Sequence, residues 1–249
     1  ASFLSISPHT DGRGPCRGIS GKSAKRDQRT VKKKIIIIIV ICAAVVLGIF
    51  LYMSFRYQNT SSERLPDRYS QVIPQVHSMT DKDGDGIDDQ ADILQSALDY
   101  IAAKPKYKSK YYQTGYPDDG YGVCTDLVAF ALKGAGYDLM TLVDEDIRAD
   151  QESYNIEKPD KNIDFRRVRN LKVYFEHKAI SLTTDLSEIE EWQGGDIVIF
   201  QDHIGIVSDR RNENGVPYVI HHNSSWQKKY EQDILEKRED LVGHYRISQ

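Results

Sequence analysis

A lone cysteine at the start of a helix-forming segment is the residue in this sequence best suited to covalent chemistry. Cys124 follows Gly122, and apolar residues recur after it at helical spacing, at Leu127, Val128, Ala131 and Leu132. We therefore expect its sulfur at a helix N-terminus, where free backbone N–H groups and the helix dipole favour a nucleophilic thiolate. The non-catalytic alternative is a small apolar side chain buried at the start of a helix.

Two histidines are expected beside one another on a predicted antiparallel sheet. Short apolar runs separated by turns predict three consecutive strands, at 195–200, 203–207 and 217–222. Antiparallel pairing brings His203, at the start of the second strand, next to His221, near the end of the third. A cysteine facing a histidine that a third polar group orients forms a nucleophile–base–orienter set. The predicted catalytic residues are therefore Cys124, His203 and His221.

The same three side chains suit a second chemistry. One cysteine and two histidines that leave a fourth position open form a catalytic zinc set. A zinc-dependent hydrolase is therefore an alternative to a thiol hydrolase, and a chelator would separate the two.

An acidic loop lies upstream of these residues. Counting from Asp81 as position 1, carboxylates fall at positions 1, 3, 5, 9 and 12, with Gly86 at position 6. Calcium takes six to eight oxygen ligands, and glycine permits the sharp turn that such a loop needs. The spacing is similar to the calcium loops of EF-hands and thrombospondin-type repeats, although it ends in Asp rather than Glu. The predicted ligands are Asp81, Asp83, Asp85, the Ile87 carbonyl, Asp89 and Asp92, with the Ile87 side chain turned inward.

The acidic loop also has a simpler explanation. Asp side chains cap helices and favour the positive end of the helix dipole, and a helix is predicted directly afterwards, at 93–103. If the loop does bind calcium and the cysteine is inert, the domain would be a calcium-stabilised module that binds the cell envelope without catalysis.

A membrane anchor is predicted near the beginning of the chain. Residues 35–55 form an uncharged apolar run of 21 residues, long enough to cross a bilayer as a helix. Three lysines precede this run, so the positive-inside rule places residues 1–34 in the cytoplasm and the rest outside. The exit from the run carries no small-x-small cleavage site, which favours an uncleaved signal-anchor. We expect a disordered basic tail at 1–34, a linker at 56–79 and an extracytoplasmic domain at 80–249.

Composition and charge limit the possible partners. The 249 residues carry a net charge of −4, but residues 1–34 hold nine Lys and Arg against two Asp and Glu, so −11 falls on the remainder. Such an acidic domain is not expected to bind nucleic acid, which requires a basic surface. The expected partners are the lipid bilayer, through residues 35–55, and an envelope peptide. Three cysteines are too few for a disulfide framework.

From about Asp85 to Arg246 the chain resembles the DUF1287 family, a branch of the NlpC/P60 papain-like superfamily. The matching segments are Gly115–Pro117, Gly122–Asp126, Asn162–Val168, Gly195–Val198, His203–Asp209, Val219–His221 and Gly243–Arg246. The resemblance implies an α+β fold with a nucleophile helix packed on an antiparallel sheet. It also implies Cys124 as nucleophile, His203 as base and His221 as the residue that orients the base. The implied reaction is cleavage of an amide without a cofactor, with peptidoglycan stem peptides as the expected substrate.

Substrate-binding residues are less directly indicated. NlpC/P60 peptidases generally carry Asp immediately before the cysteine, but this chain has Val123 there, and its nearest acid is Asp126. Tyr112 stands where these enzymes keep a tyrosine near the sulfur. Arg166 and Arg167 would suit a bidentate clamp on a substrate carboxylate, or would instead anchor their own loop. The predicted substrate-binding residues are Tyr112, Asp126, Arg166 and Arg167.

Overall fold

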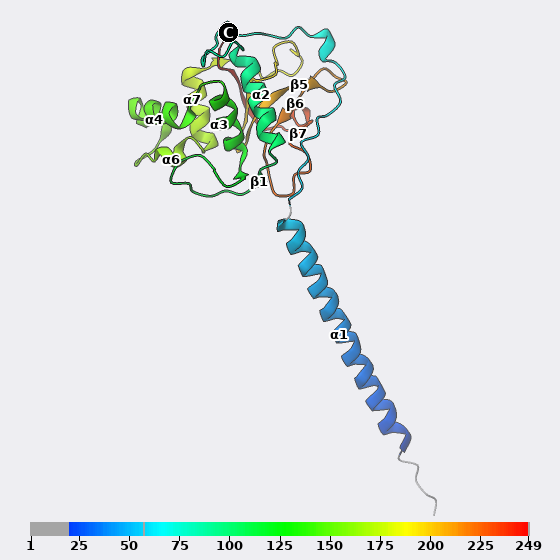
Figure 1. The fold of residues 1–249 in the computed structure, drawn as a ribbon. Coiled ribbons are helices and arrows are strands. Elements are labelled where there is room, and N and C mark those ends of the chain that lie inside the picture. Colours follow the sequence, from blue (N-terminus) through cyan, green and yellow to red (C-terminus); the bar gives the residue numbers. More distant parts are fainter. Residues whose placement is uncertain (1–19, 57, 249) are drawn as a thin grey trace, which may run out of the picture. The chain divides into compact units, whose positions relative to one another are not determined.

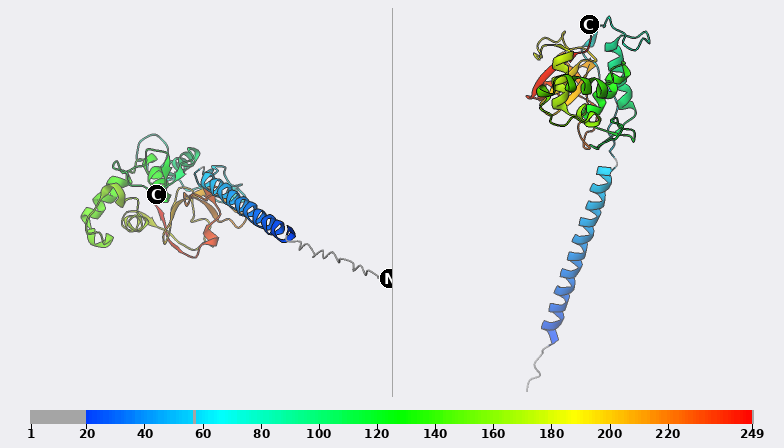
Figure 2. Two further views of the ribbon diagram at one scale, coloured as in Figure 1. Left: turned by 90° about the horizontal axis from the view of Figure 1, so that it is seen from below. Right: turned by 90° about the vertical axis from the view of Figure 1, so that its left-hand side faces the viewer.

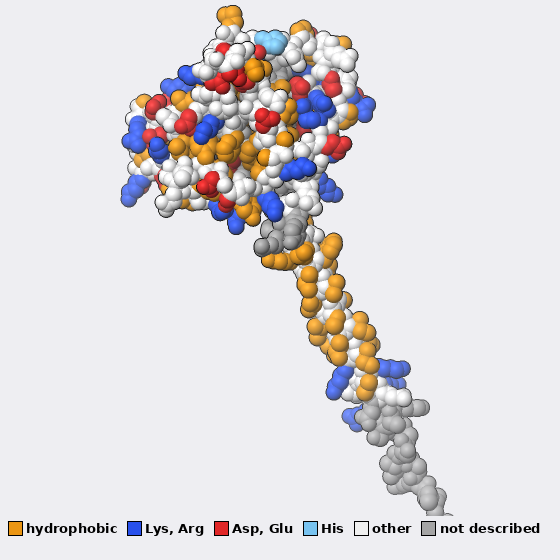
Figure 3. Space-filling view, viewed as in Figure 1, with side chains coloured by type: hydrophobic (Ala, Val, Ile, Leu, Met, Phe, Trp, Pro, Cys, Tyr) orange, Lys and Arg blue, Asp and Glu red, His pale blue; other side chains and the backbone are white. Residues whose placement is uncertain are grey.

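The computed structural model describes residues 20–56 and 58–248, and the chain divides into two units after Arg56. The first unit is helix α1 (Ser20–Arg56). Its segment Gln28–Ser54 is long and apolar enough to cross a membrane, and apolar side chains cover it beyond the lysines (Figure 3). Within the described ranges, α1 is therefore the one candidate membrane span, near the N-terminus.

Helix α1 begins earlier than the predicted anchor. Residues 20–34, expected to belong to a disordered tail, are helical. Lysine, arginine and alanine are good helix formers, so a helix nucleated in the apolar run continues into the basic segment. Residues 1–19 of the expected tail lie outside the described residues.

The second unit contains helices and one main sheet (Figures 1 and 2). The helices in green to yellow-green gather on one side of the strands in orange and red, which makes the unit a mixed α+β domain. The helices are α2 (Asp89–Ala102), α3 (Cys124–Gly134), α4 (Leu139–Ala149), α5 (Gln151–Tyr154), α6 (Lys161–Asp164) and α7 (Val168–Lys178), with 3-10 turns η1 (Ser70–Val72) and η2 (Leu235–Lys237).

Six antiparallel strands form the main sheet, in the order β3-β8-β4-β5-β6-β7. The predicted run of three consecutive antiparallel strands is confirmed as β4, β5 and β6. The bounds are β3 (Ile180–Ser181), β4 (Ile197–Phe200), β5 (Ile204–Arg211), β6 (Pro217–Ile220), β7 (Glu231–Gln232) and β8 (Leu241–Arg246); a separate parallel pair joins β1 (Lys106–Tyr107) to β2 (Tyr121–Gly122).

Each face of this sheet buries a different apolar core. Because side chains alternate along a strand, Ile204 and Ile206 of β5 pack with the helices, whereas Val207 packs on the opposite face with Trp192 and Phe200. Helices α2 and α3 contact each other and cover β5 on the first face. This packing brings the N-terminus of α3 to the start of β5.

The segment expected as a linker at 56–79 makes specific contacts with the domain. The Ser61 N–H donates to the Lys228 carbonyl at 2.7 Å, and the Tyr230 N–H donates to the Ser61 carbonyl at 3.0 Å. The guanidinium of Arg64 bonds the buried carboxylate of Glu231 at 2.9 Å. Ser61 and Arg64 are therefore held against the segment around β7, the edge strand of the sheet.

Candidate functional site

The N-terminus of α3 holds Cys124 as the sequence predicts, and its sulfur faces backbone donors. Asp126 caps the helix by accepting the Val123 N–H at 2.8 Å. The half-buried sulfur receives backbone hydrogen bonds from Ile204 and Thr125. Burial outweighs these bonds and raises the pKa of the Cys124 thiol to about 11. The cysteine therefore lies directly beside the start of β5, protonated at neutral pH.

The two predicted histidines meet across β5 and β6. Nε2 of His203 lies 2.7 Å from Nδ1 of His221, with the rings edge to face. Both side chains are buried. The His221 backbone is held by the Tyr230 carbonyl at 3.0 Å and by the Gln227 side chain at 2.9 Å. A direct hydrogen bond therefore joins the two predicted imidazoles.

The histidine pair and the thiol approach from different faces of the sheet. A Cβ placed on Gly205 would lie 3.1 Å from the Cβ of His221, on the face opposite Ile204, and His203 stacks near Phe200 on that same face. Cys124 instead packs with the helix-side core. The imidazole pair and the thiol therefore both lie near the start of β5, on opposite sides of the Ile204 backbone. No hydrogen bond joins the sulfur to either imidazole among the described residues.

Burial keeps this site uncharged. Loss of solvent lowers the pKa of His203 to about 4, helped by the positive charge of Arg238. Burial, followed by the neighbouring His203, lowers the pKa of His221 to about 3. Because burial raises the pKa of the thiol and lowers that of His203, the resting protein favours the neutral pair over a thiolate and an imidazolium. The ground state is a neutral thiol beside neutral imidazoles.

A third histidine, His222, lies near the site and was not predicted. Its Nδ1 is 3.1 Å from the Tyr100 hydroxyl, and the rings of Tyr107 and Tyr230 surround it. Its buried Nε2 has no hydrogen-bond partner in the described part of the chain. Adjacent strand residues point to opposite faces, so the His221–His222 pair was itself a signal that one imidazole would lie on each face.

An open aromatic groove of about 390 Å³ lies close to the cysteine. Tyr100, Tyr121 and Phe130 line it, together with Pro105 and Pro117. Tyr121 precedes the cysteine by three residues, and the Tyr100 hydroxyl is packed against Gly122, where a Cβ would lie 2.1 Å away. The groove therefore ends near the N-terminus of α3.

Two of the predicted substrate-binding residues hold each other. The guanidinium of Arg166 bonds both carboxylate oxygens of Asp126, at 2.5 and 2.9 Å, and its Nη1 donates to the Lys110 carbonyl. Both side chains are almost fully buried. Arg166 also lies 5.0 Å from the centre of the Tyr112 ring, whose hydroxyl donates to Asp119 at 2.7 Å. These contacts make the cluster a brace for the start of α3.

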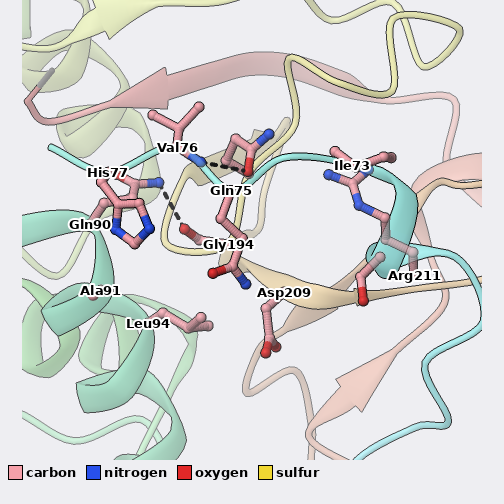
Figure 4. A pocket seen from close by; sticks show the side chains of 12 residues that line it. Ile73, Gln75, Val76, His77, Gln90, Ala91, Leu94, Gly194, Asp209 and Arg211 are labelled. Carbon is pink, nitrogen blue, oxygen red and sulfur yellow. Dashed lines mark hydrogen bonds between the residues drawn. The ribbon is translucent and has the colours of Figure 1, made fainter.

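Neither Arg167 nor a small hollow near the start of α2 belongs to the Arg166–Asp126 cluster. Arg167 is partly exposed and pairs with Asp164 at 3.4 Å. A hollow of about 80 Å³ is lined by residues that include His77, Gln90 and Gly194 (Figure 4), where Gln90 Nε2 donates to the Gly194 carbonyl at 2.8 Å. None of the three predicted catalytic residues lines it.

The acidic loop brings three of its predicted ligands together. Ligand oxygens of Asp81, Asp83 and Asp85 lie within 4.8 Å of one another, the one such group of His, Cys, Asp and Glu side chains in the described ranges. The side chain of Ile87 is not turned inward as expected, since it is 49 % exposed. Asp89 is turned elsewhere: its carboxylate accepts the Lys82 N–H at 2.8 Å and the hydroxyls of Tyr137 and Ser248.

Comparison with known proteins gives the family. Residues 94–247, more than half of the chain, match the family described as "Domain of unknown function (DUF1287)". The chain belongs to the DUF1287 family. It is also 35 % identical over 167 residues to the "Uncharacterized protein YijF" of Escherichia coli (strain K12), a match that covers 62 % of this chain and 80 % of the relative. No solved structure matches the chain. The DUF1287 match includes all three predicted catalytic residues and begins after the acidic loop.

Proposed function

We propose that this DUF1287 domain is a thiol hydrolase that cleaves an amide, with Cys124 as nucleophile and His203 as general base. The observation that carries the proposal is the 2.7 Å bond between Nε2 of His203 and Nδ1 of His221, at the strand end where Ile204 bonds the Cys124 sulfur. If Nε2–H of His203 donates to His221, the lone pair on Nδ1 of His203 is left to accept the thiol proton.

The reaction proceeds in two halves. His203 takes the thiol proton as the sulfur attacks the amide carbon, and it then gives that proton to the leaving amine, so that a thioester remains on Cys124. Water next attacks the thioester, its proton passes through His203 to the thiol sulfur, and the carboxylic acid leaves. Because the resting groups are neutral, the first proton transfer accompanies attack rather than preceding it. The Cys124 and Thr125 N–H groups at the start of α3, which face the sulfur, are suited to hold the oxyanion.

A papain-like core of the NlpC/P60 type is part of the same proposal. It is supported by the order of the elements, with a nucleophile helix before an antiparallel sheet that carries the base and the orienting residue. The expected substrate is a peptidoglycan stem peptide, and the aromatic groove beside α3 is the proposed seat for one of its side chains.

Zinc chemistry fits this geometry less well. Nε2 of His203 and Nδ1 of His221 share a hydrogen bond. The lone pair that accepts this hydrogen bond cannot bind a metal at the same time. The sulfur and the imidazoles also do not form a group with ligand atoms within 4.8 Å among the described residues. The arrangement therefore favours a proton-transfer pair over three zinc ligands.

The test uses the full-length chain in detergent and soluble muropeptides that carry intact stem peptides. Mass spectrometry should detect a cleaved amide and, after acid quenching, a hydroxylamine-sensitive acyl group on Cys124. Cys124→Ser should lose at least about 1,000-fold in turnover. Cys42→Ser, which alters a free thiol in α1, is the matched control and should keep full activity. Cleavage that persists in Cys124→Ser, or a panel of stem peptides that yields neither product nor acyl-enzyme, would contradict the proposal.

A second candidate function is an envelope-binding module without catalysis, which the protonated state of the buried Cys124 thiol favours. Peptidoglycan sedimentation separates the two: a module retains binding in Cys124→Ser and shows no turnover in the wild type.

We further propose that α1 spans the membrane with residues 1–34 in the cytoplasm and the domain outside. The apolar length of Gln28–Ser54 and the lysines at its start support this orientation. Protease added to intact spheroplasts should digest the domain and leave the N-terminal segment protected; the reverse pattern would refute the orientation.

A further inference from the structure

The segments that hold the first residues of the domain carry lysines and an exposed tryptophan. Gln58 pairs with the backbone of Tyr107 in β1: its Oε1 accepts the Tyr107 N–H at 2.5 Å, and its Nε2 donates to the Tyr107 carbonyl at 3.2 Å. The buried hydroxyl of Thr60 donates to the Gln227 carbonyl at 2.8 Å. The chain therefore enters the domain against β1 and against the loop that precedes β7.

These two segments form one basic and aromatic surface. Residues 104–110 contain four lysines and residues 226–229 contain two more, and neither segment contains an acidic residue. The Tyr230 hydroxyl joins them by donating to the Pro105 carbonyl at 2.6 Å. Beside the lysines, the Trp226 side chain is 64 % exposed. We call this the lysine–tryptophan surface, and its exposed charged and aromatic residues are Lys104, Lys108, Trp226 and Lys228.

The positive charge of this surface is only partly neutralised by the domain itself. Two of its six lysines, Lys110 and Lys229, pair with carboxylates. Its three exposed lysines form no ion pair within the described part of the chain. Residues 35–249 carry −11 in total, so these lysines are a local exception in an acidic chain. Such a patch is complementary to an anionic partner.

The covalent chain keeps this surface close to the end of α1. The candidate span ends at Ser54, four residues before Gln58. Four extended residues reach at most about 14 Å, and this limit holds for any arrangement of the two units. If α1 crosses a bilayer, as proposed above, the surface lies within reach of the lipid headgroups. Tryptophan is enriched in this interfacial layer, and lysines are attracted to its anionic headgroups.

We propose that the lysine–tryptophan surface docks on the bilayer that α1 crosses, with its lysines on anionic lipid headgroups and Trp226 inserted among them. The docking rests on the proposed span, but it does not depend on the proposed hydrolysis. It acts on the cysteine site through position, because the Lys108 N–H donates to the Gly122 carbonyl at 3.1 Å, two residues before Cys124. A docked domain therefore holds the start of α3 near the membrane surface, within reach of substrates that are attached to the membrane.

Quenching of tryptophan fluorescence by brominated lipid tests the docking. The full-length chain is reconstituted into vesicles of brominated phosphatidylcholine, with or without an equal part of brominated phosphatidylglycerol. The chain has two tryptophans, and Trp192 is fully buried, so the lipid quencher reports on Trp226. We expect strong quenching in the anionic vesicles, which high salt reverses, and much weaker quenching in phosphatidylcholine alone. Trp226→Phe, which keeps Trp192, is the control and should show little quenching.

Charge variants distinguish docking from mere proximity to the lipid. Lys104→Gln combined with Lys108→Gln should lower the ratio of docked to undocked domain about 10-fold or more, because two positive charges that face the anionic headgroups are lost. Lys82→Gln combined with Lys172→Gln makes the same charge change before α2 and on α7, and this control should dock as the wild type does.

The outcomes separate failure of the docking from failure of the span. If alkaline carbonate extracts the chain from the vesicles, the span is refuted and the docking with it. If the chain stays inserted but the wild type is quenched no more than Trp226→Phe, or equally with and without phosphatidylglycerol, the docking alone is overturned. Equal quenching in the two double-lysine variants also overturns it. Trp226 fluorescence that responds to soluble muropeptides but not to brominated lipid would assign the surface to a substrate instead.

Discussion

The acidic loop and the cysteine site gather reactive groups in opposite ways. The loop gathers three exposed carboxylates, those of Asp81, Asp83 and Asp85, from five consecutive residues. The cysteine site draws a thiol and two imidazoles from α3, β5 and the end of β6, and burial keeps all three neutral. Local sequence is thus sufficient to place like charges together. Only a packed sheet and helix can hold uncharged reactive groups at the end of a strand.

The largest expected effect tests whether the histidine pair acts as a base and its orienting residue. His203→Ala should lower kcat/KM on a cleaved stem peptide by about 100-fold or more, because the thiol loses its proton acceptor. His221→Ala should cost less, and His221→Asn should restore part of the loss, because an amide can still accept the Nε2 proton. His177→Gln, on α7 where the imidazole bonds Asp146, is the control. Equal activity of His221→Ala and the wild type would remove the orienting role.

The second prediction concerns the buried brace of α3. Arg166→Met should lower the free energy of unfolding by about 3–5 kcal/mol, because it leaves the Asp126 carboxylate buried without its cation. Arg167→Met, next along the chain but 41 % exposed at its side chain, should cost less than about 1 kcal/mol. Urea unfolding followed by Trp192 fluorescence measures both. Similar costs for the two variants would show that burial does not distinguish these pairs.

The third prediction follows from the neutral histidines. In the unfolded chain they protonate near pH 6.5, whereas in the folded domain the pKa of His203 and His222 is about 4 and that of His221 about 3. Between pH 6.5 and 4 the unfolded state therefore binds more protons, and the free energy of unfolding should fall as the pH is lowered. His221→Asn should reduce this slope, whereas His77→Asn, at an exposed imidazole, should reduce it much less. An unchanged slope in His221→Asn would mean that His221 is protonated in the fold.

The smallest effect is expected in the acidic loop. Gly86 has φ of +96°, and a Cβ there would meet no atom within 4 Å. Gly86→Ala should therefore cost only the backbone strain, about 1–2 kcal/mol. Gly120→Ala, with φ of +73° and equally open space, should cost about the same. Urea unfolding in chelator measures both, and a cost several-fold larger at Gly86 would reveal packing in the loop.

Much of the framework could be predicted from the sequence. The length of the uncharged apolar run located α1, helical spacing located the helix that begins at Cys124, and short apolar runs between turns located β4, β5 and β6. These elements follow from short-range sequence. The approach of His203 to His221 was also predictable, since consecutive antiparallel strands fix which residues are neighbours. The apolar part of α1 was predicted at the right residues, but the helix begins at Ser20 rather than at residue 35. A helix can continue into a basic segment that has no apolar pattern to reveal it.

By itself, the sequence determined which residues are available for chemistry and, in the acidic loop, how they are spaced. The tertiary structure alone decided their surroundings. It paired Asp126 with Arg166, 40 residues away, and turned Asp89 toward Tyr137. Burial and pairing depend on which segments pack together, so no local pattern encodes them. They nevertheless set the protonation of the Cys124 site.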